Sequence, residues 1–400
     1  MLVDTFFARQ PIFDRNRRLW GYELLYRSGP VRTAQVVDPV AATAHVLASV
    51  FSDTDDVDVT GGVPVFVNLP RELIVSHAIT AFPPDRVAIE VLEDVTPDQQ
   101  VMRALTELRG AGYRIALDDY GVDDPRRPLI PFVDIVKVDL MSVTPEHLPA
   151  TVGELRSTGV TMLAEKVEDA DDYVRTHGLG FSMFQGFFFA RPELVAGRRL
   201  DEGRARLAEL LAQLHRPGND IDEISDTVER HPEFALKLLR LLNSSAFGLS
   251  RTVESIREAV VMLGVRRVTE LATVLALASA QQKPRELLSL GLVRAKMCST
   301  VADRTGRPDP ASYFTVGVLS ILDALTDTPM RDLVSPLPLA DDVKDALIER
   351  TGAKGNVLDA AVAYERAEWQ RLDASDLEAA VLTESYLAAL SWSQRVLAHV

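Results

Sequence analysis

The sequence is poor in the residues and segments that several classes of protein require. Its 400 residues include a single cysteine, Cys298, which excludes an internal disulfide and a cysteine-based zinc cluster. No apolar stretch approaches the roughly 18 residues of a membrane-spanning helix, and the N-terminus lacks the charged-then-apolar pattern of a signal peptide. We therefore expect a cytoplasmic protein that does not engage a membrane.

Positive charge is also scarce. Lysine and arginine together number 43 against 58 acidic residues, which gives a formal net charge of -15. A protein of this charge repels the phosphate backbone of nucleic acids, so we expect no nucleic-acid polymer as a partner. The net negative charge is still compatible with a local basic pocket that binds a small anionic ligand. The length and the 47% hydrophobic content suit two globular domains.

Short apolar runs that end in a polar or charged residue recur through the first half. The runs span 65–67, 87–89, 115–117, 135–136, 162–164 and Phe184, and the residues that follow them are Asn68, Glu90, Asp118 with Asp119, Lys137, Glu165 and Gln185. Such runs are typical of buried strands, and the intervening segments, such as 97–112, have the spacing of amphipathic helices. Alternation of this kind indicates right-handed βα units and a parallel sheet. Residues 1–197 are therefore predicted to form a TIM-like (β/α) barrel with polar residues at its active rim.

From residue 198 onward the pattern is helical throughout. Helices are predicted over 201–214, 221–230, 233–243, 255–280, 286–305, 311–325, 340–351, 355–371 and 376–400. Turn-forming sequences, among them Pro217-Gly218-Asn219 and Lys283-Pro284, separate several of these segments. We therefore predict that residues 198–400 form a second, all-α domain.

The polar residues of the predicted barrel favour a particular chemistry. Six of them offer oxygen ligands without cysteine or histidine: Glu23, Asn68, Glu90, Asp118, Asp119 and Glu165. Such a set suits Mg²⁺ or Mn²⁺ better than Zn²⁺, and the consecutive aspartates are placed to bridge two metal ions that activate water. Lys137 would then orient or deprotonate that water. Taken singly, each of the five acidic residues also fits a solvated βα loop, but together with Asn68 they make six polar residues in register, which favours a metal site.

These residues resemble the EAL domains, which hydrolyse the bacterial second messenger cyclic di-GMP to the linear dinucleotide pGpG. The signature appears as Glu23-Leu24-Leu25-Tyr26-Arg27, and further matching segments follow in order at Arg9-Gln10-Pro11, Asn68, Glu90–Glu93, Asp118-Asp119-Tyr120-Gly121, Lys137-Val138-Asp139, Glu165–Glu168 and Gln185-Gly186. The resemblance implies that Glu23 binds metal, that Glu165 is catalytic and that Arg27 contacts a phosphate. It also implies nucleotide contacts from Gln10 and Gln185, and loop-bracing roles for Glu93 and Glu168.

One segment departs from the family pattern. After Gly121 the family continues with a short threonine- or alanine-glycine-aromatic-serine-serine-leucine loop that helps to place the metals, whereas this chain reads Val122-Asp123-Asp124-Pro125-Arg126-Arg127-Pro128. Two prolines and two extra acids give this loop a different shape, so we expect Glu93 to have lost its usual partner. A loosely held site loses orders of magnitude in rate, so ligand binding is expected to be more robust than turnover.

The helical half is similar to HDOD domains, relatives of HD phosphohydrolases that act as signalling or interaction modules. The similarity rests on the segments 221–234, 238–244, 255–260 and 263–268. An EAL-like domain followed by HDOD is the arrangement of YuxH-type regulators. The position of the histidine-aspartate pair of HD hydrolases reads Val318–Asp323, and no histidine lies between His231 and His399, so we expect no hydrolytic centre here. His215 and His231 are predicted to be helix-capping or surface residues.

Three hypotheses follow from this pattern. The chain is a cyclic di-GMP phosphodiesterase that uses two Mg²⁺ or Mn²⁺ ions, a catalytically inactive cyclic di-GMP receptor, or a scaffold that acts through protein contacts alone. All three make the helical domain a regulatory or interaction module with a protein partner that the sequence does not identify. The resemblance also suggests a homodimer formed through the barrel.

Overall fold

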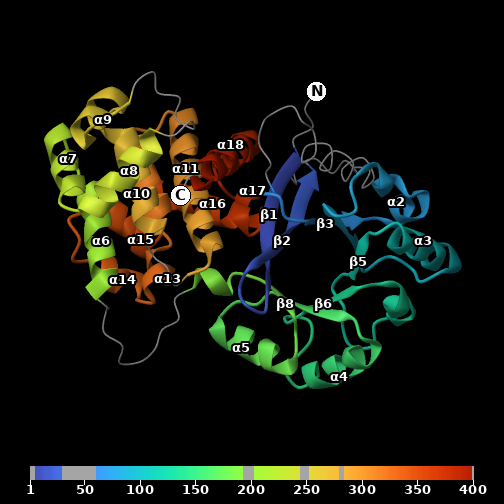
Figure 1. The fold of residues 1–400 in the computed structure, drawn as a ribbon. Coiled ribbons are helices and arrows are strands. Elements are labelled where there is room, and N and C mark those ends of the chain that lie inside the picture. The colour runs from blue at the N-terminus through green and yellow to red at the C-terminus, as the bar shows by residue number, and fades with distance from the viewer. Residues whose placement is uncertain (1–4, 29–59, 192–201, 244–251, 279–282, 399–400) are drawn as a thin grey trace. The chain divides into compact units, whose positions relative to one another are not determined.

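The computed structural model describes residues 5–28, 60–191, 202–243, 252–278 and 283–398 (Figure 1). The chain divides into two compact units, Met1–Phe189 with Glu365–Ala367, and Ala190–Tyr364 with Glu368–Val400. The predicted boundary between residues 197 and 198 lies outside the described residues and stays a prediction. No helix in the described part of the chain is long and apolar enough to cross a bilayer.

The first unit is a closed barrel in which eight strands follow one another in sequence order. The strands are β1 (Thr5–Asp14), β2 (Leu19–Ser28), β3 (Val65–Leu69), β4 (Val87–Val91), β5 (Arg114–Leu117), β6 (Ile135–Asp139), β7 (Thr161–Glu165) and β8 (Met183–Gln185). Between them lie the helices α2 (Arg71–Ser76), α3 (Gln99–Gly110), α4 (Leu148–Thr158) and α5 (Ala170–Leu179), and the 3₁₀ turns η1 (Ala78–Ala81) and η2 (Arg127–Phe132), with η3 (Phe188–Ala190) after β8. The predicted TIM-like barrel is confirmed.

The first strand departs from the parallel sheet that we predicted. Strands β2 to β8 pair in parallel, but β1 runs antiparallel to both of its neighbours, β2 and β8. A tight turn is the reason: Asp14 Oδ1 accepts hydrogen bonds from the backbone N–H groups of Asn16 and Arg18, at 2.8 and 2.9 Å. Because the chain reverses within a few residues, β2 must return antiparallel to β1.

Two layers of side chains fill the described barrel interior. Both follow from the alternation of side chains along a strand, in which every second residue points inward. A buried apolar layer takes one residue from each of seven strands: Ile12, Phe66, Ala88, Ala116, Ile135, Leu163 and Met183. Side chains two residues apart on a strand share a face, so the next inward positions toward the carboxyl ends are Asn68, Glu90, Asp118, Lys137, Glu165 and Gln185. On the reversed strand β1 the equivalent residue lies two positions earlier, at Gln10. The barrel thus places a polar layer directly above its apolar core.

All regular elements in the described residues of the second unit are helices, as predicted. Its helices are α6 (Glu202–Leu214), α7 (Ile221–Glu229), α8 (Pro232–Leu242), α9 (Ile256–Leu263), α10 (Val265–Ala278), α11 (Arg285–Arg304), α12 (Pro310–Leu319), α13 (Leu322–Thr326), α14 (Met330–Val334), α15 (Asp341–Ile348), α16 (Gly352–Glu365), α17 (Trp369–Asp373) and α18 (Ala379–Leu397). Apolar faces of α6 to α10 form one buried cluster, which includes Ile224, Leu238 and Val268.

Three predicted helices are broken in the structure. The segment 255–280 forms α9 and α10, because Gly264 has a φ of +85°, a conformation that side-chain-bearing residues rarely adopt and that ends a helix. The segment 311–325 divides into α12 and α13 around Ser320, and 355–371 divides into α16 and α17, with Ala367 at a φ of +54°. Apolar periodicity continues across all three breaks, which is why pattern alone joined them.

His215 does not have the capping or surface role that we predicted for it. Its ring lies between two hydroxyl groups, with Nε2 2.8 Å from Thr273 Oγ1 and Nδ1 2.7 Å from Thr315 Oγ1. Burial lowers the pKa of His215 to about 4, so the ring is neutral at physiological pH. The histidine therefore joins α6, α10 and α12 through neutral hydrogen bonds.

Candidate functional site

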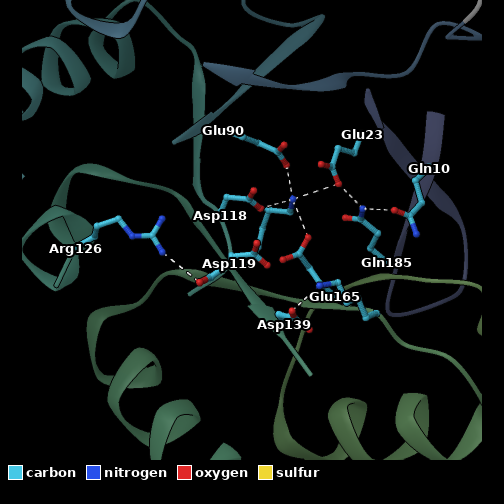
Figure 2. A network of polar contacts seen from close by, with 11 residues as sticks. Gln10, Glu23, Glu90, Asp118, Asp119, Arg126, Asp139, Glu165 and Gln185 are labelled. Atoms are coloured by element: carbon cyan, nitrogen blue, oxygen red, sulfur yellow. Dashed lines mark hydrogen bonds and ion pairs between the residues drawn. The ribbon is translucent and has the colours of Figure 1, made fainter. Parts of the chain in front are cut away.

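The polar layer converges on one buried lysine, Lys137. Figure 2 shows the carboxyl groups of Glu23, Glu90, Asp118 and Glu165 turned toward a common centre. The ammonium Nζ of Lys137 lies 2.6 Å from Asp118 Oδ1, 2.7 Å from Glu90 Oε1, 2.8 Å from Glu165 Oε1 and 3.3 Å from Glu23 Oε2. All five residues are buried. One formal positive charge thus faces four carboxyl groups at the carboxyl end of the barrel, where catalytic residues of this fold gather.

Burial and mutual repulsion change the protonation of these groups. Burial, with Glu23 and Asp118 nearby, raises the pKa of Glu90 well above its ordinary value. The same causes raise the pKa of Glu165 to about 8, against the lowering effect of Lys137. Burial alone would lower the pKa of Lys137, but Asp118 and Glu165 outweigh it and raise that pKa well above its ordinary value. The lysine is therefore a cation among these carboxyl groups, and its predicted role in orienting or deprotonating water stays a prediction.

Two glutamines close one side of the cluster. Gln185 Nε2 donates to Gln10 Oε1 at 2.9 Å and makes a short contact with Glu23 Oε2. The following residue, Gly186, has a φ of +146°, and a Cβ atom there would lie 2.1 Å from the carbonyl oxygen of Val167. Only glycine fits so close an approach, so the glutamine-glycine pair seats Gln185 against β1 and β2.

A second group of carboxylates lies beside the lysine. One ligand oxygen each from Glu93, Asp118 and Asp119 can be chosen so that all three lie within 4.8 Å of one another. Asp118 is buried and belongs to both groups, whereas Glu93 and Asp119 are exposed. The structure thus places Glu93 with the paired aspartates, and its predicted loop-bracing role stays a prediction.

The donor set fits a divalent cation. Glu90 Oε2, Glu165 Oε2 and Gln185 Oε1 are buried oxygen atoms that receive no hydrogen bond from the described residues. Unsatisfied buried acceptors cost free energy that a bound cation would recover. Hard divalent cations such as Mg²⁺, Mn²⁺ and Ca²⁺ prefer oxygen ligands of this kind.

The loop that departs from the family pattern supports the site in its own way. Arg126 donates to Asp124 through its backbone N–H at 2.7 Å and through Nε and Nη2 at 3.0 and 2.6 Å. Its Nη2 also donates to the backbone carbonyl of Asp119 at 3.2 Å (Figure 2). The side chains of Arg126 and Asp124 are only 3% and 5% exposed. A buried ion pair therefore holds the backbone of a proposed metal ligand.

This support matters because Asp119 has an uncommon conformation. Its φ is +44°, in the left-handed region that aspartate tolerates at some cost. The sequence departs visibly from the usual loop, but its pattern did not identify Arg126 as the residue that supports Asp119. The sequence does contain a signal for this ion pair: Asp124 lies two residues before Arg126, and the rigid Pro125 lies between them.

The remaining predicted residues lie near the cluster or outside the described side chains. Asn68 is half-buried on β3, and its backbone pairs with that of Glu90. The backbone N–H of Glu168 donates to Asp172 Oδ2 at 3.2 Å. Arg27 pairs with Phe6 in the register of β2 and β1, and its side chain lies outside the described residues. The predicted roles of these three residues therefore stay predictions.

Two known protein families match this chain, one in the barrel and one in the helical unit. The family model of the EAL domain matches residues 5–192, and that of the HDOD domain matches residues 204–326. Among solved structures, the chain resembles Klebsiella pneumoniae BlrP1 in its complex with calcium and cyclic di-GMP, at 24% identity and a TM-score of 0.37, over 47% of this chain and 56% of that one.

Two relatives match along nearly their whole length. The uncharacterized protein YuxH of Bacillus subtilis (strain 168) is 31% identical over 404 residues, which cover 98% of this chain and 99% of YuxH. The cyclic di-GMP phosphodiesterase CdgJ of Vibrio cholerae serotype O1 is 32% identical over 405 residues, which cover 99% of this chain and 94% of CdgJ. The chain belongs to the family of EAL- and HDOD-domain proteins that includes YuxH and CdgJ.

Proposed function

We propose that the barrel binds cyclic di-GMP together with divalent cations and hydrolyses one phosphodiester bond to give linear pGpG. The observation that carries the proposal is the set of four buried carboxyl groups around Lys137, with Asp119 and Glu93 beside them. The family relationship to a protein named as a cyclic di-GMP phosphodiesterase supports the choice of substrate.

The oxygen ligands define where the cations would be held. The proposed ligands are Glu23, Asn68, Glu90, Asp118, Asp119 and Glu165, with Mg²⁺ or Mn²⁺ as the cations. When bound, such a pair of cations lowers the pKa of water and offsets the charge of the phosphodiester. Asp118 belongs to both carboxylate groups, so it is the residue best placed to join two cation positions.

The side chains of the site position the substrate and the attacking water. Lys137 is held by carboxylates from four strands, so its ammonium is a fixed donor toward the attacking water or a phosphate oxygen. Glu165, whose Oε1 lies 2.8 Å from Lys137 Nζ, has the catalytic role that the family resemblance implies for it. By family resemblance, Arg27 contacts a phosphate group, and Gln10 and Gln185 contact the nucleotide.

The test is to follow cyclic di-GMP binding and pGpG formation in the same samples of full-length protein, with Mn²⁺ or Mg²⁺. We expect product that disappears with chelator and falls at least about a hundredfold in Glu23→Ala. Glu72→Ala changes an exposed glutamate on α2 and should retain wild-type turnover. Binding without product would make the chain a receptor, and the absence of both would favour the scaffold hypothesis.

The proposal extends to the setting of the protein. We propose a cytoplasmic location, a homodimer formed through the barrel, and a protein partner for the HDOD domain, with the domain boundary near residue 197. Sedimentation velocity with and without cyclic di-GMP would test the dimer, since a monomer under both conditions contradicts it.

A further inference from the structure

The helical unit contains a cavity of its own. Its volume is about 490 Å³, within the range of roughly 300–1,000 Å³ that is usual for sites of small organic ligands. The loop 215–219 after α6, one face of α10, the starts of α12 and α15, and Lys354 of α16 line it. All of these residues belong to the second compact unit, so the cavity is independent of the barrel site.

Two adjacent residues of α10 point to a ligand. The hydroxyl Oγ1 of Thr269 is buried and has no hydrogen-bond partner among the described residues. Glu270 is only 12% exposed, and its ion pair with Arg266 spans 3.6 Å, longer than a hydrogen bond. Burial raises the pKa of the Glu270 carboxyl group by more than the nearby Lys296, Arg266 and Arg267 lower it. A buried hydroxyl without a hydrogen-bond partner and a half-buried carboxyl group therefore line the cavity next to each other.

The rest of the lining limits what the ligand can be. Arg216, Arg266 and Lys354 face Glu270, Asp309 and Asp342, so the formal charges balance, and Lys354 and Asp342 pair with each other. A balanced lining selects against ligands of high net charge of either sign. The nearly fully buried Leu339 and Val343 add apolar wall to the cavity. The ligand should therefore be small, nearly neutral, partly apolar and rich in N–H donors.

We propose that this cavity binds a purine nucleoside, with guanosine as the best match. Guanosine carries two neighbouring N–H groups on one edge, which match the two oxygens of a carboxylate such as Glu270. The hydroxyl of Thr269 can donate to or accept from the same edge. The faces of the base would pack on the apolar wall, and the ribose hydroxyls would meet the polar mouth at Asp309 and Arg216. The helical unit is thus a small-molecule binding domain in addition to any protein contact it makes.

Calorimetric titration of the full-length protein with guanosine tests this proposal. We expect saturable binding, with adenosine weaker by about tenfold or more because it presents a single N–H group at the corresponding edge. Glu270→Gln replaces a carboxylate oxygen acceptor with an N–H donor at nearly constant shape. The affinity for guanosine should therefore fall by about tenfold or more. Glu229→Gln makes the same change on the exposed surface of α7 and should leave binding unchanged. Thr269→Val gives a second test in case Glu270→Gln fails to fold, as judged by thermal melting.

Hydrogen exchange identifies the location of the binding site. Guanosine should protect amides in 214–219 and 309–316, around the mouth of the cavity. Protection in 114–120 instead would place guanosine in the barrel and overturn the proposal. Absence of guanosine binding, or wild-type affinity in a folded Glu270→Gln protein, would overturn it as well. None of these readouts depends on turnover of cyclic di-GMP, so the failure of one proposal is distinguishable from the failure of the other.

Discussion

The barrel and the helical unit bury polar side chains in opposite ways. In the barrel, four carboxyl groups gather around Lys137, and three buried oxygens of this layer receive no hydrogen bond from the described residues. In the helical unit, His215 is neutral and lies between Thr273 and Thr315. The barrel site therefore leaves oxygen acceptors open to cations from solution, whereas the histidine network finds its partners within the protein.

The direction of each hydrogen bond in the histidine network can be deduced. The hydroxyl of Thr273 donates to the backbone carbonyl of Thr269 at 2.7 Å, so it accepts from His215 Nε2–H. Because the neutral ring has only one N–H, Nδ1 of His215 is then the acceptor for the hydroxyl of Thr315, which lies 2.7 Å from Nδ1 and 3.1 Å from the backbone carbonyl of Ala311. A charged ring would lose this acceptor and turn the hydroxyl of Thr315 toward the carbonyl of Ala311, and burial opposes the positive charge itself, so the network responds to acid.

The largest expected effect comes from removing the central cation of the barrel. Lys137→Met leaves four buried carboxyl groups without their shared partner, so in metal-free buffer the free energy of unfolding should fall by about 3–5 kcal/mol. Added Mn²⁺ should recover more stability in this variant than in the wild type, because the carboxylates remain. Urea denaturation with and without Mn²⁺ measures both effects.

A matched control is available one strand away. Lys166 pairs with Asp139 at 2.6 Å, but its side chain is 53% exposed. Lys166→Met should therefore cost at most about 1 kcal/mol. If the two variants lose similar stability, Lys137 is not a buried counter-ion, and the contrast between the two regions fails.

A smaller effect is expected from the loop that supports Asp119. In Arg126→Gln the shorter amide side chain cannot make both side-chain hydrogen bonds to Asp124 and also donate to the carbonyl of Asp119. Turnover should therefore fall about 10–100-fold. The Mn²⁺ concentration for half-maximal activity should rise with it, a shift that a merely destabilised protein would not show.

The neighbouring arginine gives the control. The side chain of Arg127 is 68% exposed and pairs with Glu154 at 2.7 Å, so Arg127→Gln should leave the Mn²⁺ dependence unchanged. An Arg126→Gln protein with the Mn²⁺ dependence of the wild type would show that the buried ion pair does not position the metal ligand.

Period-two patterning allowed much of the barrel site to be predicted. A polar residue two positions after an inward apolar one, as with Phe66 and Asn68 or Ala88 and Glu90, must share its face, so recurring polar residues indicated one rim. The reversal of β1 escaped prediction because the turn that causes it depends on local hydrogen bonds of Asp14. The family resemblance, rather than periodicity, identified Gln10.

Other features depend on tertiary contacts that a sequence does not display. The charge of Lys137 follows from carboxylates on other strands, the nearest in sequence being 19 residues away at Asp118. His215 looked like a helix end because its partner residues are 58 and 100 positions distant. Gly264, by contrast, is a helix-breaking residue that the sequence displays, but the apolar period continues across it.

The smallest expected effect is a pH dependence confined to the helical unit. The pKa of His215 is about 4 in the folded protein and near 6.5 when unfolded, so the unfolded chain binds more protons between these values. The stability from His215 is therefore complete above pH 6.5 and is lost as the pH falls toward 4, at roughly 1 kcal/mol per pH unit. His215→Gln keeps one donor and one acceptor but cannot titrate, so its free energy of unfolding in urea should depend less on pH in this window.

His231→Gln, at an exposed histidine, gives the control and should retain the wild-type slope of unfolding free energy against pH. Equal slopes for all three proteins would mean that the ring accepts a proton without breaking its bonds to Thr273 and Thr315.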